Sequence, residues 1–74
     1  MSNYYVADAG NGMMKVTNTK TGAQEGTVSY SGTVISPPIV NGNQCSFIVE
    51  DSSGQKTGWT VQLPNGQRIG TFRA

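Results

Sequence analysis

The chain has 74 residues, of which 35% are hydrophobic and 12% are charged, and its net charge is +1. A chain of this length forms a single domain that hides only about 60% of the surface exposed by its unfolded form, so its core is small. The weak charge argues against a protein that binds nucleic acid through a basic surface, and no apolar run is long enough to span a membrane. A small core at near-zero charge favours association, so we expect a homo-oligomer or a part of a larger protein assembly.

Three strands are predicted in the first part of the chain. Residues 3–8 are rich in the aromatic and β-branched side chains that suit a pleated surface. Residues 13–18 follow a glycine-containing turn, and residues 26–30 follow a second turn at 19–22. No stretch repeats its apolar residues with the helical period of 3.6, so these segments predict an antiparallel meander.

Residues 33–40 differ from the other strand-like segments because they contain Pro37 and Pro38. Proline cannot donate to a strand ladder, so this segment predicts an edge strand, a bulge or a bridging arm. We favour a stiff connector between two meanders over a dedicated partner-binding arm, since one Pro-Pro pair is a weak recognition signal. An edge with unpaired amides still recruits other chains, so we expect this segment at contacts between subunits.

The last third of the chain predicts a second three-stranded meander. Residues 44–50 form its most hydrophobic strand, and residues 58–72 read as two strands folded about Asn65 and Gly66. Asn-Gly supplies the two positive-φ positions that a tight type I′ hairpin requires.

Trp59 is expected to anchor the core of this hairpin. Trp59, Val61 and Leu63 stand at every second position, which is the pattern of a strand with one buried face. We therefore predict that Trp59 is buried and that Trp59→Ala costs about 3 to 5 kcal/mol.

The two halves of the chain share a pattern that predicts an internal repeat. Residues 3–30 and 44–73 would be its copies, joined by residues 31–43 within one domain. The pattern Gly-x-x-x-Gly-Thr-apolar occurs at 22–28 and again at 66–72. A short strand ending in Asp, a glycine turn, a second strand and this pattern resemble the blade repeat of β-propeller proteins. The resemblance implies a propeller built by several chains or a shared meander arrangement, and it transfers no binding residue, because the Trp-Asp and Gly-His pairs of that family are absent.

The sequence offers little for catalysis or metal binding. Histidine is absent and Cys45 is the single cysteine, which removes the commonest general base and metal ligands. Cys45 shares strand parity with Phe47, so we favour a buried thiol over an intermolecular disulfide. Asp8 and Asp51 end strands before turns, where a carboxylate accepts hydrogen bonds from turn amides. We therefore predict a protein that is not an enzyme and holds no metal or cofactor.

Aromatic side chains support one alternative function. Tyr5, Tyr30 and Trp59 could stack against a sugar or the bases of single-stranded nucleic acid. Tyr5 shares parity with Ala7 and is expected to be exposed, where it also suits a protein interface.

We predict an all-β domain of six or seven short antiparallel strands, arranged as two meanders in a small sandwich or barrel. Its expected function is that of a non-enzymatic structural or assembly protein, and its composition resembles that of capsid-decorating or tail-associated virion proteins. The N-terminus lacks a secretion signal, which predicts synthesis in the cytoplasm. The residues expected at subunit contacts are Tyr5, Val34, Ile35, Pro37, Pro38 and Ile39.

Overall fold

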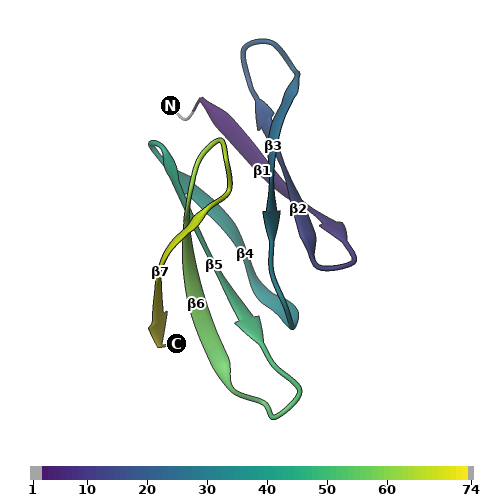
Figure 1. Ribbon diagram of the computed structural model, residues 1–74, viewed down its shortest axis with the longest axis vertical. Helices are drawn as coiled ribbons and strands as arrows, with labels where there is room; N and C mark the ends of the chain where they lie inside the picture. The colour runs from purple at the N-terminus through teal and green to yellow at the C-terminus, as the bar shows by residue number, and fades with distance from the viewer. Residues whose placement is uncertain (1–2, 74) are drawn as a thin grey trace.

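Seven antiparallel strands form two sheets in the computed structural model, which describes residues 3–73 (Figure 1). The prediction of an all-β domain is confirmed, and of its two predicted arrangements, sandwich or barrel, the two sheets fit the sandwich. This part of the chain contains no helix that could cross a membrane. Sheet A has the strand order β1 (Tyr4–Gly10), β2 (Met13–Asn18), β3 (Gln24–Ser29). Sheet B has the strand order β4 (Thr33–Asn41), β5 (Gln44–Glu50), β6 (Lys56–Gln62), β7 (Arg68–Arg73).

The segment expected as a connector is itself a strand of sheet B. β4 pairs with β5, so the second sheet has four strands where the sequence predicted three. The pairing shifts register between Val34 and Ser36 and again between Ser36 and Ile39, the interval that contains both prolines. Proline is tolerated in an edge strand of this kind, because the N–H group that it lacks would have faced the open side, where there is no partner strand.

The type I′ turn lies at Asn11 and Gly12, not at Asn65 and Gly66. Asn11 has φ 55° and Gly12 has φ 77°, and Asn11 is the one non-glycine residue with positive φ within residues 3–73. A two-residue turn at 65–66 would require the residue before it to donate across the hairpin, and that residue is Pro64, which has no N–H. The chain forms the longer loop 63–67 instead.

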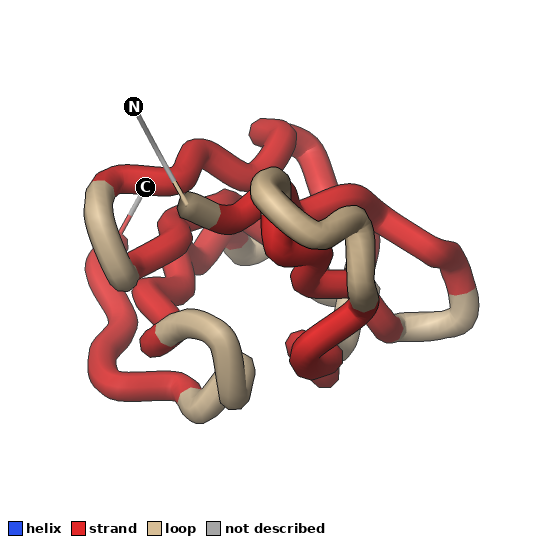
Figure 2. Tube along the Cα trace, turned by 90° about the horizontal axis from the view of Figure 1, so that it is seen from above, coloured by secondary structure: helices blue, strands red, loops and turns tan. Residues whose placement is uncertain are grey.

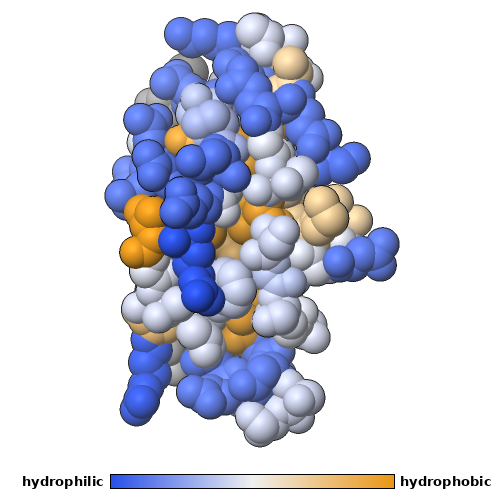
Figure 3. Space-filling view, in the orientation of Figure 1, coloured by the Kyte–Doolittle hydropathy of each residue, from blue (hydrophilic) through white to orange (hydrophobic). Residues whose placement is uncertain are grey.

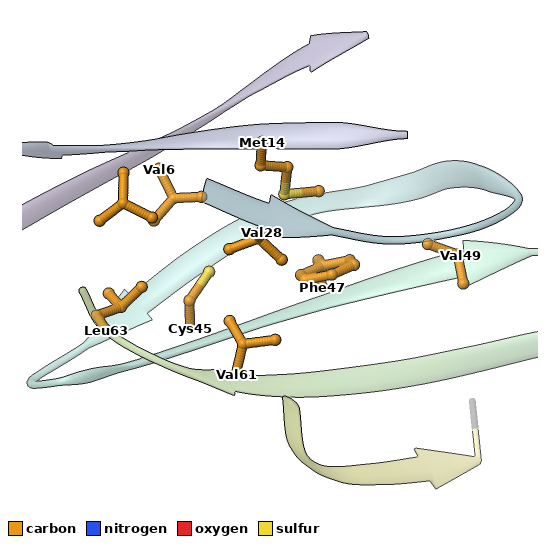
Figure 4. Close-up of a cluster of buried hydrophobic side chains, with 9 residues drawn as sticks. Val6, Met14, Val28, Cys45, Phe47, Val49, Val61 and Leu63 are labelled. Carbon is orange, nitrogen blue, oxygen red and sulfur yellow. The ribbon is translucent and has the colours of Figure 1, made fainter. Parts of the chain in front are cut away.

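The core lies between the facing sides of the two sheets. Sheet A contributes side chains from all three of its strands, and sheet B contributes side chains from β5, from β6 and from the residue that follows β6 (Figure 4). Cys45 is fully buried, as predicted. The nine buried residues are Val6, Met14, Val16, Val28, Cys45, Phe47, Val49, Val61 and Leu63.

The two sheets also contact each other at two margins, in addition to the core between them. Figure 2 views the two sheets from above. β1 lies beside β4. On the other side, the backbone of β3 touches the β6–β7 loop: a Cβ atom on Gly26 would overlap the carbonyl oxygen of Pro64, and one on Gly66 would overlap that of Thr27. These two positions require glycine because the two backbones are in direct contact.

Candidate functional site

The solvent-facing side of sheet B carries a group of uncharged side chains. Cross-strand partners point to the same face, and Phe47 and Val61 point into the core, so the residues that alternate with them point outward. Two rows of paired residues run across this side of the sheet. In one row, Ile48 pairs with Gly58, which pairs with Phe72. In the other row, Ile39 pairs with Ser46, Ser46 pairs with Thr60, and Thr60 pairs with Gly70. We call the following set the sheet B outer face: Ile39, Ser46, Ile48, Gly58, Thr60, Gly70 and Phe72.

The apolar members of the sheet B outer face lie close together and reach solvent. The ring of Phe72 occupies the space above Gly58, where any Cβ atom would overlap it, and so buries this glycine. Phe72 itself remains 44% exposed and Ile39 is 66% exposed, while Ile48 is half-buried. A glycine beneath an aromatic ring keeps the face flat, since the ring lies down on the strand.

The polar members of this face are short hydroxyls. Ser46 Oγ and Thr60 Oγ1 lie 3.4 Å apart and share a hydrogen bond. Charged groups enter only at one end of the sheet, where Glu50 is paired in register with Lys56. The sheet B outer face can therefore be covered by another protein surface without removing a charge from water.

The residues that the sequence assigned to subunit contacts fall into two places. Ile35, Pro37 and Ile39 are exposed on β4, whereas Val34 and Pro38 on the same strand are half-buried, and Val34 packs against the core. Tyr5 is 62% exposed, as predicted, but lies on the outer side of sheet A. Of this predicted set, Ile39 belongs to the sheet B outer face.

Trp59 is less buried than its strand pattern predicted. It shares the inner side of β6 with Val61 but is only half-buried at the margin of the core. Its ring contacts Phe47 at a centroid distance of 5.9 Å, and the guanidinium carbon of Arg68 lies 4.9 Å from its centroid. The alternation of residues along a strand predicts the side to which each side chain points. It does not predict how much of the strand the opposite sheet covers, and this is why Trp59 is less buried than expected. Figure 3 shows hydrophobic residues reaching the surface near the middle of this face of the molecule.

Two of the three aromatic residues of the ligand-binding alternative contact the same core ring. Tyr30 meets the edge of Phe47 at a centroid distance of 5.8 Å, and Phe47 is also the ring that contacts Trp59. Tyr5 is not part of this cluster, because it points away from the core on sheet A.

The hydroxyl of Tyr30 is committed to Asp8. It donates to Asp8 Oδ1 at 2.6 Å, and the Gly10 amide donates to the same oxygen at 2.9 Å. The hydrogen bond to the carboxylate raises the pKa of Tyr30 to about 12, and the same bond, with help from Gly10, lowers the pKa of Asp8. Asp8 therefore accepts a hydrogen bond from the turn that follows it, as predicted, and also holds Tyr30, which the sequence did not predict.

Asp51 has a similar role in the β5–β6 turn. It accepts hydrogen bonds from the Ser53 hydroxyl at 2.6 Å and from the amides of Ser53 and Gln55, both at 2.9 Å. The Ser53 hydroxyl is the main cause of its lowered pKa. Its oxygen is thus engaged by the turn, as predicted.

Other chemical features are sparse in the described part of the chain. Residues 3–73 contain no group of three or more His, Cys, Asp or Glu side chains placed to hold a metal ion. Burial raises the pKa of Cys45 to about 11, so its thiol is protonated at neutral pH and is a poor nucleophile. A pocket of about 200 Å³ lies beside β7 and is lined by Gln55, Thr57, Thr71, Phe72 and Arg73.

Sequence reasoning assigned Ile39 to a contact surface but overlooked Ile48 and Phe72, the other two large apolar members of the sheet B outer face. Ile48 carried a readable signal, because it stands between Phe47 and Val49 and breaks the alternation of apolar and polar residues. Phe72 carried none, because its position above Gly58 depends on the register between β6 and β7, which the unexpected loop length sets.

Comparison with known protein families, characterised proteins and solved structures finds no match for this chain. The resemblance to propeller blades therefore stays a prediction.

Proposed function

We propose that this chain is a non-enzymatic structural protein that assembles with copies of itself through the sheet B outer face. The observation that carries the proposal is the uncharged apolar group formed by the exposed Ile39 and Phe72 and the half-buried Ile48. Sheets pack face to face about 10 Å apart, and short hydroxyls and a flat ring permit that approach. A second copy is a suitable occupant, because a net charge of +1 produces little repulsion between copies.

Magnitudes favour assembly from several contacts over one strong pair. Complete burial of an isoleucine or phenylalanine side chain contributes about 1.5 to 3 kcal/mol, so three contribute at most about 9 kcal/mol. Association costs about 4 to 15 kcal/mol in lost freedom, which leaves a weak pairwise contact. The protein would then act as one of many subunits, made in the cytoplasm and built into a homo-oligomer or a larger particle such as a virion.

Light scattering across a concentration series tests this proposal. Wild-type protein is expected to show a mass above that of the monomer, rising with concentration, and Ile39→Thr to shift this series towards the monomer. Met13→Thr is the matched control, because Met13 is an exposed apolar residue on the outer side of sheet A. Even a very weak complex, with a dissociation constant of about 1 mM, would be partly formed at that protein concentration. A wild-type protein that remains monomeric up to about 1 mM would therefore contradict the proposal.

The second candidate is a module that binds a sugar or single-stranded nucleic acid. The half-buried indole of Trp59 beneath Arg68 favours it, since aromatic rings and guanidinium groups both stack on planar ligands. A monomer that binds a glycan or an oligonucleotide, and loses binding in Trp59→Ala, would establish this function in place of the first.

A further inference from the structure

Three of the four sheet edges are covered or broken. β1 lies beside β4, which accounts for one edge of each sheet. β4 is also interrupted by register shifts around Pro37 and Pro38. β3 is covered where Gly26 and Thr27 meet the β6–β7 loop. Coverage, proline and irregular pairing are the usual ways in which proteins prevent an edge from accepting another strand.

Within residues 3–73, the fourth edge, β7, is neither covered nor interrupted by proline, and its one irregularity is a register shift in its pairing with β6. All six of its residues are exposed, it contains no proline, and no other strand of the described chain lies on its far side (Figure 1). Alternate residues of such a strand direct N–H and C=O groups to the open side, where an extended segment can pair with them.

The charge beside this edge is of one sign. Residues 56–73 contain Lys56, Arg68 and Arg73 and no acidic residue. Arg68 is paired with Val61 and Arg73 with Thr57, so both arginines lie on the inner side of the sheet. An added strand would meet two positive charges on one of its faces.

Arg68 is held in a geometry that suits a carboxylate. Its guanidinium lies over the Trp59 ring, with the carbon 4.9 Å from the centroid. Contact with an aromatic ring restrains the guanidinium and leaves N–H groups at its edge available for a bidentate acceptor.

The same charges disfavour pairing of β7 with a second copy of itself. An antiparallel pair with full overlap would place Arg68 opposite Arg73 twice, and like charges directly opposite each other are destabilising. The complementary occupant is therefore a segment of another protein that carries negative charge.

We propose that β7 binds an extended acidic segment of a partner protein by strand addition, with two carboxylates opposite Arg68 and Arg73. The register shift between Thr60 and Val61 adds one residue to β7, so the five steps from Arg68 to Arg73 span the four steps from Val61 to Thr57 on β6. Acidic residues four apart in the partner then lie on one face and reach both arginines. This inference does not depend on whether the sheet B outer face joins copies of the chain.

A synthetic peptide provides the probe. The peptide Thr-Glu-Val-Thr-Val-Glu-Thr-amide, with fluorescein attached at its N-terminus, has its glutamates four positions apart on one face and valines on the other. We expect it to bind wild-type protein in anisotropy titrations and to shift the amide resonances of β7 while leaving those of sheet A unchanged. Binding should weaken as ionic strength approaches about 1 M, where the Debye length is about 3 Å.

Variants and altered peptides decide the mechanism. Arg68→Gln and Arg73→Gln are each expected to weaken binding by about two- to fivefold, the range of an exposed ion pair. Lys20→Gln makes the same charge change in the exposed β2–β3 turn and should leave binding unchanged. If an arginine variant fails to fold, two altered peptides tested on wild-type protein still decide whether binding is by strand addition to a basic edge. One has lysine in place of each glutamate, and the other is N-methylated at alternate amides. Both should bind much more weakly than the original peptide.

Several results would overturn the proposal. They are absence of peptide binding, equal binding of the lysine or N-methylated peptide, and resonance shifts confined to sheet A. Binding of an oligothymidine without binding of the acidic peptide would instead assign this surface to nucleic acid. None of these results alters the mass of the unliganded protein, so the test of assembly through the sheet B outer face stands apart.

Discussion

The two sides of sheet B come from the same strands but meet different surroundings. On the inner side, Phe47 and Val61 lie against sheet A and are almost fully buried. On the outer side, Ile48 and Phe72 are also apolar, yet no element of the described chain covers them. Period-2 alternation therefore does not mark this sheet as one buried side and one polar side. An apolar side that the fold leaves uncovered is a candidate contact surface.

The largest difference between the two sides is expected from the two phenylalanines. Phe47 is 1% exposed, so Phe47→Ala should lower the free energy of unfolding by about 3 to 5 kcal/mol. Phe72→Ala should lower it by about 1 kcal/mol, because this ring is already partly in water. Urea denaturation of both variants at a concentration where the protein is monomeric makes the comparison. Equal losses would show that Phe72 belongs to the core.

Two glycines give a second contrast. Gly26→Ala should cost about 3 kcal/mol, because the added methyl group meets the Pro64 backbone, which cannot turn aside as a side chain does. Gly70→Ala is the control on the outer side, where no atom lies within 4 Å of the added Cβ, and should change stability by less than about 0.5 kcal/mol. Thermal melting of the two variants measures this difference. A stable Gly26→Ala protein would mean that the sheets are not in contact at β3.

Trp59 provides a comparison within the inner side, between a half-buried residue and the fully buried Phe47. Because its indole is half-buried and partly covered by Arg68, Trp59→Ala should cost about 2 kcal/mol, less than Phe47→Ala and less than the strand pattern alone predicted. Urea denaturation again provides the measurement. A loss as large as that of Phe47→Ala would place Trp59 in the core after all.

The smallest expected effect is a dependence on alkaline pH that arises from Cys45 on the inner side of sheet B and from Tyr30, which packs against the core. The folded-state pKa of Tyr30 is about 12, above its ordinary value of 10.0, so its contribution to stability is present below pH 10 and is lost as pH rises towards 12. Cys45 behaves alike between pH 9.0 and about 11. Tyr30→Phe should therefore flatten the upper part of the curve of unfolding free energy against pH and leave the part due to Cys45. An unchanged curve above pH 10 would show that the hydrogen bond to Asp8 does not form in solution.

Sequence predicted the strands and the fold class well, because alternation and turn residues are local signals. It placed Trp59 and Val61 on the correct side of β6 for that reason. It misjudged the depth of Trp59, the turn at Asn65 and the role of β4, since each depends on contacts between distant segments. The same limit hid Phe72, whose partner Gly58 is known only once the register is set.

Contacts between copies test the central claim most directly. In a mixture of isotope-labelled and unlabelled protein, isotope-filtered NOE spectra detect only contacts between different chains. We predict such contacts between the methyl groups of Ile39 or Ile48 in one copy and the ring of Phe72 in another. An associated protein whose intermolecular contacts all come from sheet A, with Met13 among them and none from the sheet B outer face, would contradict the account.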